Sequence, residues 1–157
     1  MATNARSSID SRSAGLLREL AQLNIDSRDG FDYAAERIED EALPIATRFR
    51  ELSDERARFA EQLDGLLINN GEDVPEEGSW AASMHRTWMN VRDMLTDKVD
   101  IYAVVAEAER GEDVIKNAYE DALREVSGNV LTLVTEQYAA VKQAHDSVRD
   151  LRDSLKK

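Results

Sequence analysis

The chain has no cysteine, and this absence excludes several kinds of chemistry at once. Without thiols there are no disulfides, no thiolate nucleophile and no cysteine-ligated zinc. The sequence also has no Gly-x-Ser-x-Gly element and no glycine-rich phosphate loop, so nucleophilic catalysis has no support. No stretch approaches the roughly 20 apolar residues of a membrane span, and the N-terminus lacks a signal-like apolar run. We therefore expect a cytoplasmic protein.

Basic side chains are few compared with acidic ones. The chain has 20 Lys and Arg against 32 Asp and Glu, a net charge of −12. No cluster of basic residues interleaved with aromatic ones occurs in the sequence. Phosphate backbones and anionic lipid surfaces repel such a chain. The sequence therefore predicts neither nucleic-acid binding nor membrane binding.

The apolar residues recur at helical spacing, and no strand-like alternation is found. A length of 157 residues suits a single domain with one core. We predict an all-α fold with one four-helix-bundle domain at residues 14–157. The segment 1–13 is rich in small and polar residues and is predicted to be a flexible N-terminal tail.

Start and stop signals divide this domain into five helices. They are predicted at about residues 14–39, 41–69, 79–95, 98–125 and 129–156. Asp40, Ser79 and Asp97 are the predicted N-caps. Pro44 lies in a first turn, where its missing N–H does little harm. Residues 71–78 are predicted to form a loop.

The lengths of the connections predict the topology. Short loops join antiparallel neighbours, so the first two long helices form one hairpin and the last two form another. The long middle connection, which carries the helix at 79–95, crosses the bundle. Two hairpins and a crossover are the ferritin-like four-helix-bundle topology, here with an extra helix in the crossover. Bundles of this kind often pair side by side, so a homodimer is expected.

A polar layer is predicted near the middle of the bundle. In the helix at 98–125, Gly111 and Glu112 stand where the apolar stripe calls for core residues. The other long helices carry polar residues at similar levels. The predicted layer consists of Asp29, Glu36, Glu55, Arg56, Glu109, Glu112, Gln137 and His145. Buried charges are tolerated when they are paired, so the first interpretation is a network that fixes helix register.

The crossover helix carries a second candidate group, His85 and Trp88, which lie three residues apart on one face. Trp88 is interpreted as a packing residue. His85 is predicted to donate a hydrogen bond to a bundle carboxylate such as Glu109. The two residues would then latch the crossover helix to the bundle.

Four short motifs resemble those of a known family. They are Asp29–Phe31 (DGF), His85–Met89 (HRTWM), Arg110–Asp113 (RGED) followed by Tyr119, and Ala144–Asp146 (AHD). With these motifs the chain resembles the bacterial ferritin-like four-helix-bundle family called domain of unknown function twenty-three eighty-three, over Leu16 to Leu151. The resemblance implies a ferritin-like fold and a bacterial origin, and it implies no settled activity.

The ligand pattern of ferritin-like di-iron proteins is missing. Those proteins use one Glu from each of two helices and a Glu-x-x-His pair from each of two others. The position three residues after a glutamate is occupied by Arg58 after Glu55, by Glu112 after Glu109 and by Ala139 after Glu136. Neither histidine has a glutamate three residues before it. No cofactor and no di-metal centre are therefore predicted. A single metal ion or a small anion that uses part of the layer stays open. The metal would bind Glu55, Glu112 and His145, although Arg56 and Arg110 would compete for the carboxylates.

Three functions from different classes remain. The favoured one is a non-catalytic structural, interaction or stress-associated protein, because no complete catalytic set is found. The second is a degenerate ferritin-like metal-binding protein or oxidase, based on the polar layer. The third is a small-ligand carrier that uses a gap beside Gly111 and Gly30.

Overall fold

The computed structural model describes residues 9–69, 80–96 and 98–156. Within these segments the chain is all-α, as predicted, with five helices and no strand. The helices are α1 (Ser11–Ile38), α2 (Leu43–Asn69), α3 (Ala81–Met94), α4 (Ile101–Leu123) and α5 (Gly128–Ser154). Each helix begins and ends within three residues of the expected bounds. Because α1 begins at Ser11, residues 11–13 belong to a helix and not to a tail.

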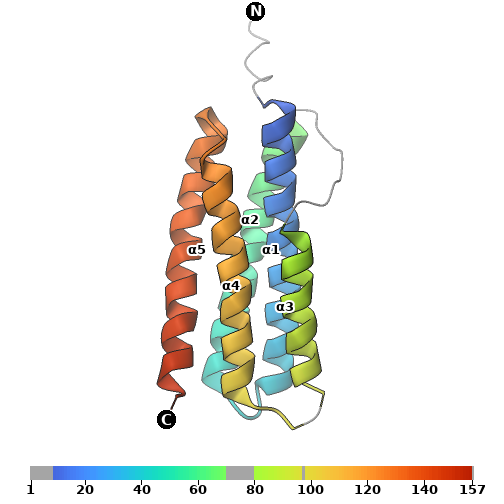
Figure 1. Ribbon diagram of the computed structural model, residues 1–157, viewed down its shortest axis with the longest axis vertical. Helices are drawn as coiled ribbons and strands as arrows, with labels where there is room; N and C mark the ends of the chain where they lie inside the picture. Colours follow the sequence, from blue (N-terminus) through green and yellow to red (C-terminus); the bar gives the residue numbers. More distant parts are fainter. Residues whose placement is uncertain (1–8, 70–79, 97, 157) are drawn as a thin grey trace, which may run out of the picture.

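The four long helices lie side by side along the long axis of the molecule, and the shorter α3 lies against the outside of α1 and α4 (Figure 1). The closest neighbours are α1 with α2 and α4 with α5, while α2 and α5 touch very little. In the turn after α1, the N–H groups of Glu41 and Ala42 donate to the carbonyl of Ile38. Gly128, with a φ of 63°, opens α5 in the left-handed conformation that glycine adopts readily.

Two aspartates cap helices at their N-termini. The Asp10 carboxylate accepts a hydrogen bond from the Ser13 N–H at 2.8 Å, and the Asp100 carboxylate accepts one from the Ala103 N–H at 3.2 Å. These bonds satisfy N–H groups that have no partner within the helix. Asp100 therefore has the role that was expected of Asp97.

The other predicted boundary signals have mixed outcomes. Pro44 lies in the first turn of α2, as predicted. The prediction for Asp40 is wrong, because α2 begins at Leu43 and Asp40 lies in the preceding turn. Asp97, Ser79 and the predicted loop at 71–78 lie outside the described residues.

Aromatic packing joins α3 to the core. The Phe31 ring on α1 lies 5.1 Å from the Phe49 ring on α2 and 5.0 Å from the Trp88 ring on α3, measured between centroids. The indole of Trp88 lies directly against Gly30, where an added Cβ would overlap the ring. At Gly111 on α4, an added Cβ would lie 3.5 Å from the same indole. Trp88 therefore occupies the space directly against Gly30 and also lies close to Gly111.

Candidate functional site

A completely buried ion pair joins α2 to α4. Both amino groups of the Arg56 guanidinium donate to Glu112, one to each carboxylate oxygen, at 2.8 Å. The two side chains have an exposed fraction of 0%. Burial alone would lower the pKa of Arg56, but the charge and the hydrogen bonds of Glu112 outweigh it, and the pKa is raised. Arg56 therefore keeps its charge, and its two-point contact with Glu112 joins α2 to α4.

Glu55 lies beside this pair but is not part of it. Its Oε1 atom is 3.8 Å from Nε of Arg56, and neither atom has a hydrogen-bond partner among the described residues. Burial raises the pKa of Glu55, and the charge of Glu112 raises it further, against the opposing effect of Arg56. The Arg56 guanidinium thus stands where a metal held by Glu55 and Glu112 would have to bind.

A neutral hydrogen-bonded network continues the buried layer through all four long helices. The Tyr119 hydroxyl on α4 donates to Oε1 of Gln137 on α5 at 2.7 Å and accepts from Nδ2 of Asn24 on α1 at 2.9 Å. Nε2 of Gln137 donates to Oε1 of Gln62 on α2 at 2.9 Å. Because Tyr119 is fully enclosed, burial raises its pKa well above the ordinary value of 10.0.

Tyr119 is expected to stay protonated in the folded protein at pH values where a solvent-exposed phenol ionises. Its contribution to stability is present in full below an unfolded pKa of about 10 and is lost as the pH rises further, because the unfolded chain then releases a proton that the folded chain keeps. Phenolate absorbance of the native protein should therefore be the same for wild type and Tyr119→Phe. A native titration curve that loses one phenolate in the variant would contradict the assignment.

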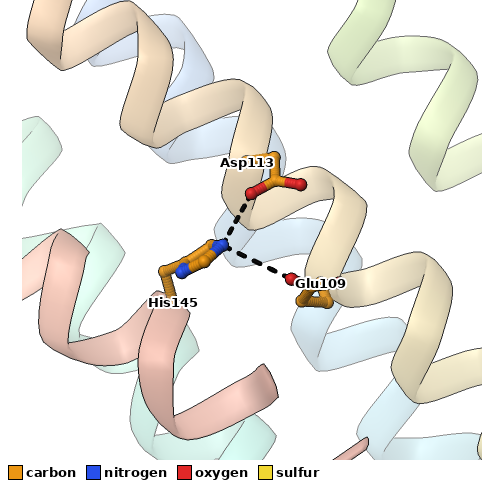
Figure 2. A group of neighbouring side chains, drawn as sticks. All are labelled: Glu109, Asp113 and His145. Atoms are coloured by element: carbon orange, nitrogen blue, oxygen red, sulfur yellow. Dashed lines mark hydrogen bonds and ion pairs between the residues drawn. The ribbon is translucent and has the colours of Figure 1, made fainter.

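His145 lies in a second polar cluster on α4 and α5, away from the Arg56–Glu112 pair. Figure 2 shows its ring on α5 pointing toward Glu109 and Asp113, which lie one turn apart on α4. Nε2 of His145 is 2.6 Å from Oδ1 of Asp113 and 3.4 Å from Oε2 of Glu109. On the other side of the ring, Nδ1 is 3.3 Å from Oδ1 of Asp146. Both ring nitrogens therefore face carboxylate oxygens.

Arginines of α5 hold the outer side of this cluster. Nη1 of Arg152 donates to Oε1 of Glu109 at 2.8 Å, which leaves Oε2 of the same carboxylate directed at His145. Nη1 of Arg149 donates to Oδ1 of Asp146 at 3.3 Å. The predicted combination of Glu55, Glu112 and His145 is therefore not found, because Arg56 binds Glu112 and lies beside Glu55, whereas His145 faces other carboxylates of α4.

Two predicted members of the layer face solvent. The Asp29 side chain is 65% exposed and pairs with its neighbour Arg28, and Glu36 is also exposed. The buried face of α1 in this region is defined by Phe31, Ala35 and Ile38. Since these residues point inward at helical spacing, positions 29 and 36 point outward. Both assignments to the layer are wrong.

The predicted latch between His85 and Glu109 is also wrong. The His85 side chain is 53% exposed and lies 4.0 Å from Oδ2 of Asp26, measured from its Nδ1 atom. Trp88 is buried, so it packs as predicted, and its Nε1 donates to Sδ of Met84 at 3.1 Å. Inward placement of Trp88 turns His85 toward the edge beside α1.

Other contacts hold the crossover helix in place. The N–H of Trp80 donates to Oε2 of Glu19 on α1 at 2.7 Å. Nδ2 of Asn90 donates to Oε2 of Glu107 on α4 at 3.0 Å. These bonds tie α3 to both helices that it covers.

A comparison with known families assigns the chain. A family model described as Domain of unknown function (DUF2383) matches residues 14–125. The chain belongs to the DUF2383 family. The suspected resemblance is confirmed, although the matched range ends before the Ala144–Asp146 motif that was part of it. No curated protein matches the chain.

The residues matched by the DUF2383 model include the buried pair, Arg56 and Glu112, and also Tyr119 of the neutral network. His145 of the second cluster and Gln137 of the neutral network lie beyond the matched residues, on α5. In the described part of this DUF2383 chain, no helix is long and apolar enough to cross a membrane.

The same DUF2383 chain has an open pocket between α1 and α3. Its volume is about 200 Å³, and its lining includes Asp26, Gly30, Tyr33, His85, Trp88 and Arg92. The Arg92 guanidinium lies 4.2 Å from the centre of the Tyr33 ring, at a distance typical of a cation–π contact. Gly30 lines this pocket and Gly111 does not, so the predicted gap is found beside one of the two glycines.

Proposed function

We propose that the protein is a ferritin-like four-helix bundle without catalytic activity, which acts as a structural or interaction protein. The pairing of α1 with α2 and of α4 with α5 supports this topology, with α3 as the extra helix of the crossover. The proposal includes a bacterial, cytoplasmic and stress-associated role and the formation of a homodimer.

The Arg56–Glu112 pair carries this proposal. A ferritin-like metal centre needs inward-facing carboxylates that are free to bind cations. Here the guanidinium of Arg56 takes both oxygens of Glu112 at 2.8 Å in a site without solvent. A metal at the same carboxylate would be repelled by the guanidinium by about 4 kcal/mol per unit of ionic charge at 4 Å and an effective dielectric of 20. The protein's own cation therefore replaces a metal at the centre.

Small-ligand carriage is the second candidate function, and the pocket between α1 and α3 favours it. Tyr33 and Trp88 provide aromatic surfaces there, and Asp26, His85 and Arg92 provide polar groups at its edge. Small-molecule sites commonly combine an apolar surface with a few polar groups.

The test of the non-catalytic proposal is iron oxidation. Chelator-treated protein is given Fe²⁺ under anaerobic conditions and then oxygen, and oxygen consumption is followed for wild type and Glu112→Ala. We expect both proteins to match the protein-free buffer, because neither holds a di-iron centre. Circular dichroism of both proteins checks that each is folded. Catalysed oxidation by the wild type, with two retained metals per chain that are lost in Glu112→Ala, would overturn the proposal.

A further inference from the structure

We propose that Glu109, Asp113 and His145 form a binding site for one divalent transition-metal ion, with Zn²⁺ as the best-fitting ion. This site lies between α4 and α5 and does not use the buried Glu112 (Figure 2). It provides one imidazole nitrogen and two carboxylate oxygens, the donor types that Zn²⁺ accepts beside cysteine. The inference does not depend on the proposed function, because one ion at this place forms no di-iron centre.

The distances between the donor atoms fit a single small ion. One donor atom from each of the three residues lies within 4.8 Å of the other two. Metal–ligand bonds of about 2.0–2.2 Å in a tetrahedron separate the ligand atoms by about 3.3–3.6 Å. The separation between Nε2 of His145 and Oε2 of Glu109 is already 3.4 Å. The separation from Nε2 to Oδ1 of Asp113 is 2.6 Å and has to widen by less than about 1 Å.

The surroundings of the imidazole suit a metal ion at Nε2. In the metal-free protein a proton between Nε2 of His145 and Oδ1 of Asp113 accounts for their separation of 2.6 Å, and a metal ion would take the place of that proton. The ring proton would then lie on Nδ1, which is 3.3 Å from Oδ1 of Asp146. A lone pair cannot stay 2.6 Å from a carboxylate oxygen unless a proton or a metal ion lies between them. A carboxylate on the far ring nitrogen is also the usual outer partner of metal-binding histidines.

The charges around the site leave it attractive to a divalent ion. The carboxylates that face the ring are Glu109, Asp113 and Asp146, and the guanidinium groups that face these carboxylates belong to Arg149 and Arg152. Lys142 also acts on Asp146, and Asp150 and Asp153 pair with the two arginines. With a neutral ring, these five carboxylates and three cationic groups carry a net charge of −2. Arg152 binds only Oε1 of Glu109 and leaves Oε2 available, unlike Arg56, which occupies both oxygens of Glu112.

Exposure gives an ion access to the site. The Asp113 side chain is 51% exposed, whereas Glu109 and His145 are nearly buried. An ion can thus enter beside Asp113, and water can complete its coordination.

The experiment is a calorimetric titration of the chelator-treated full chain with Zn²⁺ alone, repeated with Co²⁺ for its visible absorption. We expect one ion per chain in the wild type. His145→Gln and Asp113→Asn should each weaken the affinity at least tenfold, because each removes one of three protein ligands. Asp113 is half exposed, so its variant tests the site even if His145→Gln does not fold. The imidazole resonances of His145, followed by NMR, should shift when Zn²⁺ is added.

Two variants serve as matched controls. His85→Gln removes the other histidine, and Asp121→Asn removes an exposed carboxylate of α4 that pairs with Arg124. Both should bind Zn²⁺ with the wild-type affinity. The inference is overturned if the wild type binds no ion, or if His145→Gln and Asp113→Asn bind as tightly as wild type. Such a failure leaves the iron-oxidation result unaffected, so the two proposals fail separately.

Discussion

Replacing Glu112 by leucine is expected to lower the free energy of unfolding by about 3–5 kcal/mol while the helix content stays the same. The substitution removes the partner of Arg56, whose guanidinium is completely buried and ionised. An uncompensated charge in such a place costs far more than the lost hydrogen bonds alone. Urea denaturation followed by circular dichroism measures the change.

A second pair in the same protein provides the control. Arg12 and Glu125 make the same two-point contact, at 2.7 Å, but on the surface. Glu125→Leu should change the free energy of unfolding far less than Glu112→Leu does, because solvent screens the pair.

The double variant Arg56→Met, Glu112→Leu tests whether the stability lost in Glu112→Leu comes from the buried charge that is left without a partner. Replacing both charges by apolar side chains should recover most of the stability lost in Glu112→Leu, since no charge then remains buried alone. An unchanged denaturation midpoint for Glu112→Leu would show that Glu112 is hydrated in solution.

Gly30→Ala is expected to destabilise the protein by about 2–3 kcal/mol, even though alanine favours helices over glycine. The added Cβ would overlap the Trp88 indole, a large buried ring that also contacts Phe31. Either α3 must move away from α1 or the indole must leave its rotamer, and both changes lose packing. Thermal and urea denaturation measure the effect.

Gly15 and Gly65 are the matched controls for this substitution. Both lie within helices, and a Cβ added at either meets no atom within 4 Å. Alanine at these positions should raise the stability by about 0.5–1 kcal/mol, because it lowers the conformational freedom of the unfolded chain. If Gly30→Ala stabilised the protein equally, α3 would not pack against α1 as the structure describes.

The helices were predictable from sequence because their apolar stripes are long and regular. Their ends were less predictable, and α4 is the clearest case, since two aspartates before it are equally good caps. Asp97 and Asp100 differ only in position, and the choice between them depends on where the apolar face of α4 meets the core. The contact of the Trp88 indole with Gly30 was not predicted, for a related reason. A glycine within a helix indicates a close neighbour, but it does not say which side chain that neighbour provides.

The buried pair was predictable in part, and the second cluster was not. Glu112 interrupts an apolar stripe, which is a signal for a buried charge that needs a partner such as Arg56. His145 also lies on an apolar face, but its partners depend on the rotation of α5 against α4, which periodicity does not fix. The spacing of Glu109 and Asp113, four residues apart on α4, was the available signal. Asn24 was visible only as a break in the stripe of α1.

The opposite charges of Arg56 and Glu112 also decide how the two halves of the chain recognise each other. The α1–α2 hairpin contributes the buried guanidinium of Arg56 to the interface between the halves, and the α4–α5 hairpin contributes the buried carboxylate of Glu112. Two copies of the same half, docked face to face, would bury like charges against each other, whereas the two different halves neutralise one another. The pair thus selects against homotypic docking of the halves. A dimer that exchanges whole hairpins between chains keeps the same arginine–glutamate contact and escapes this selection.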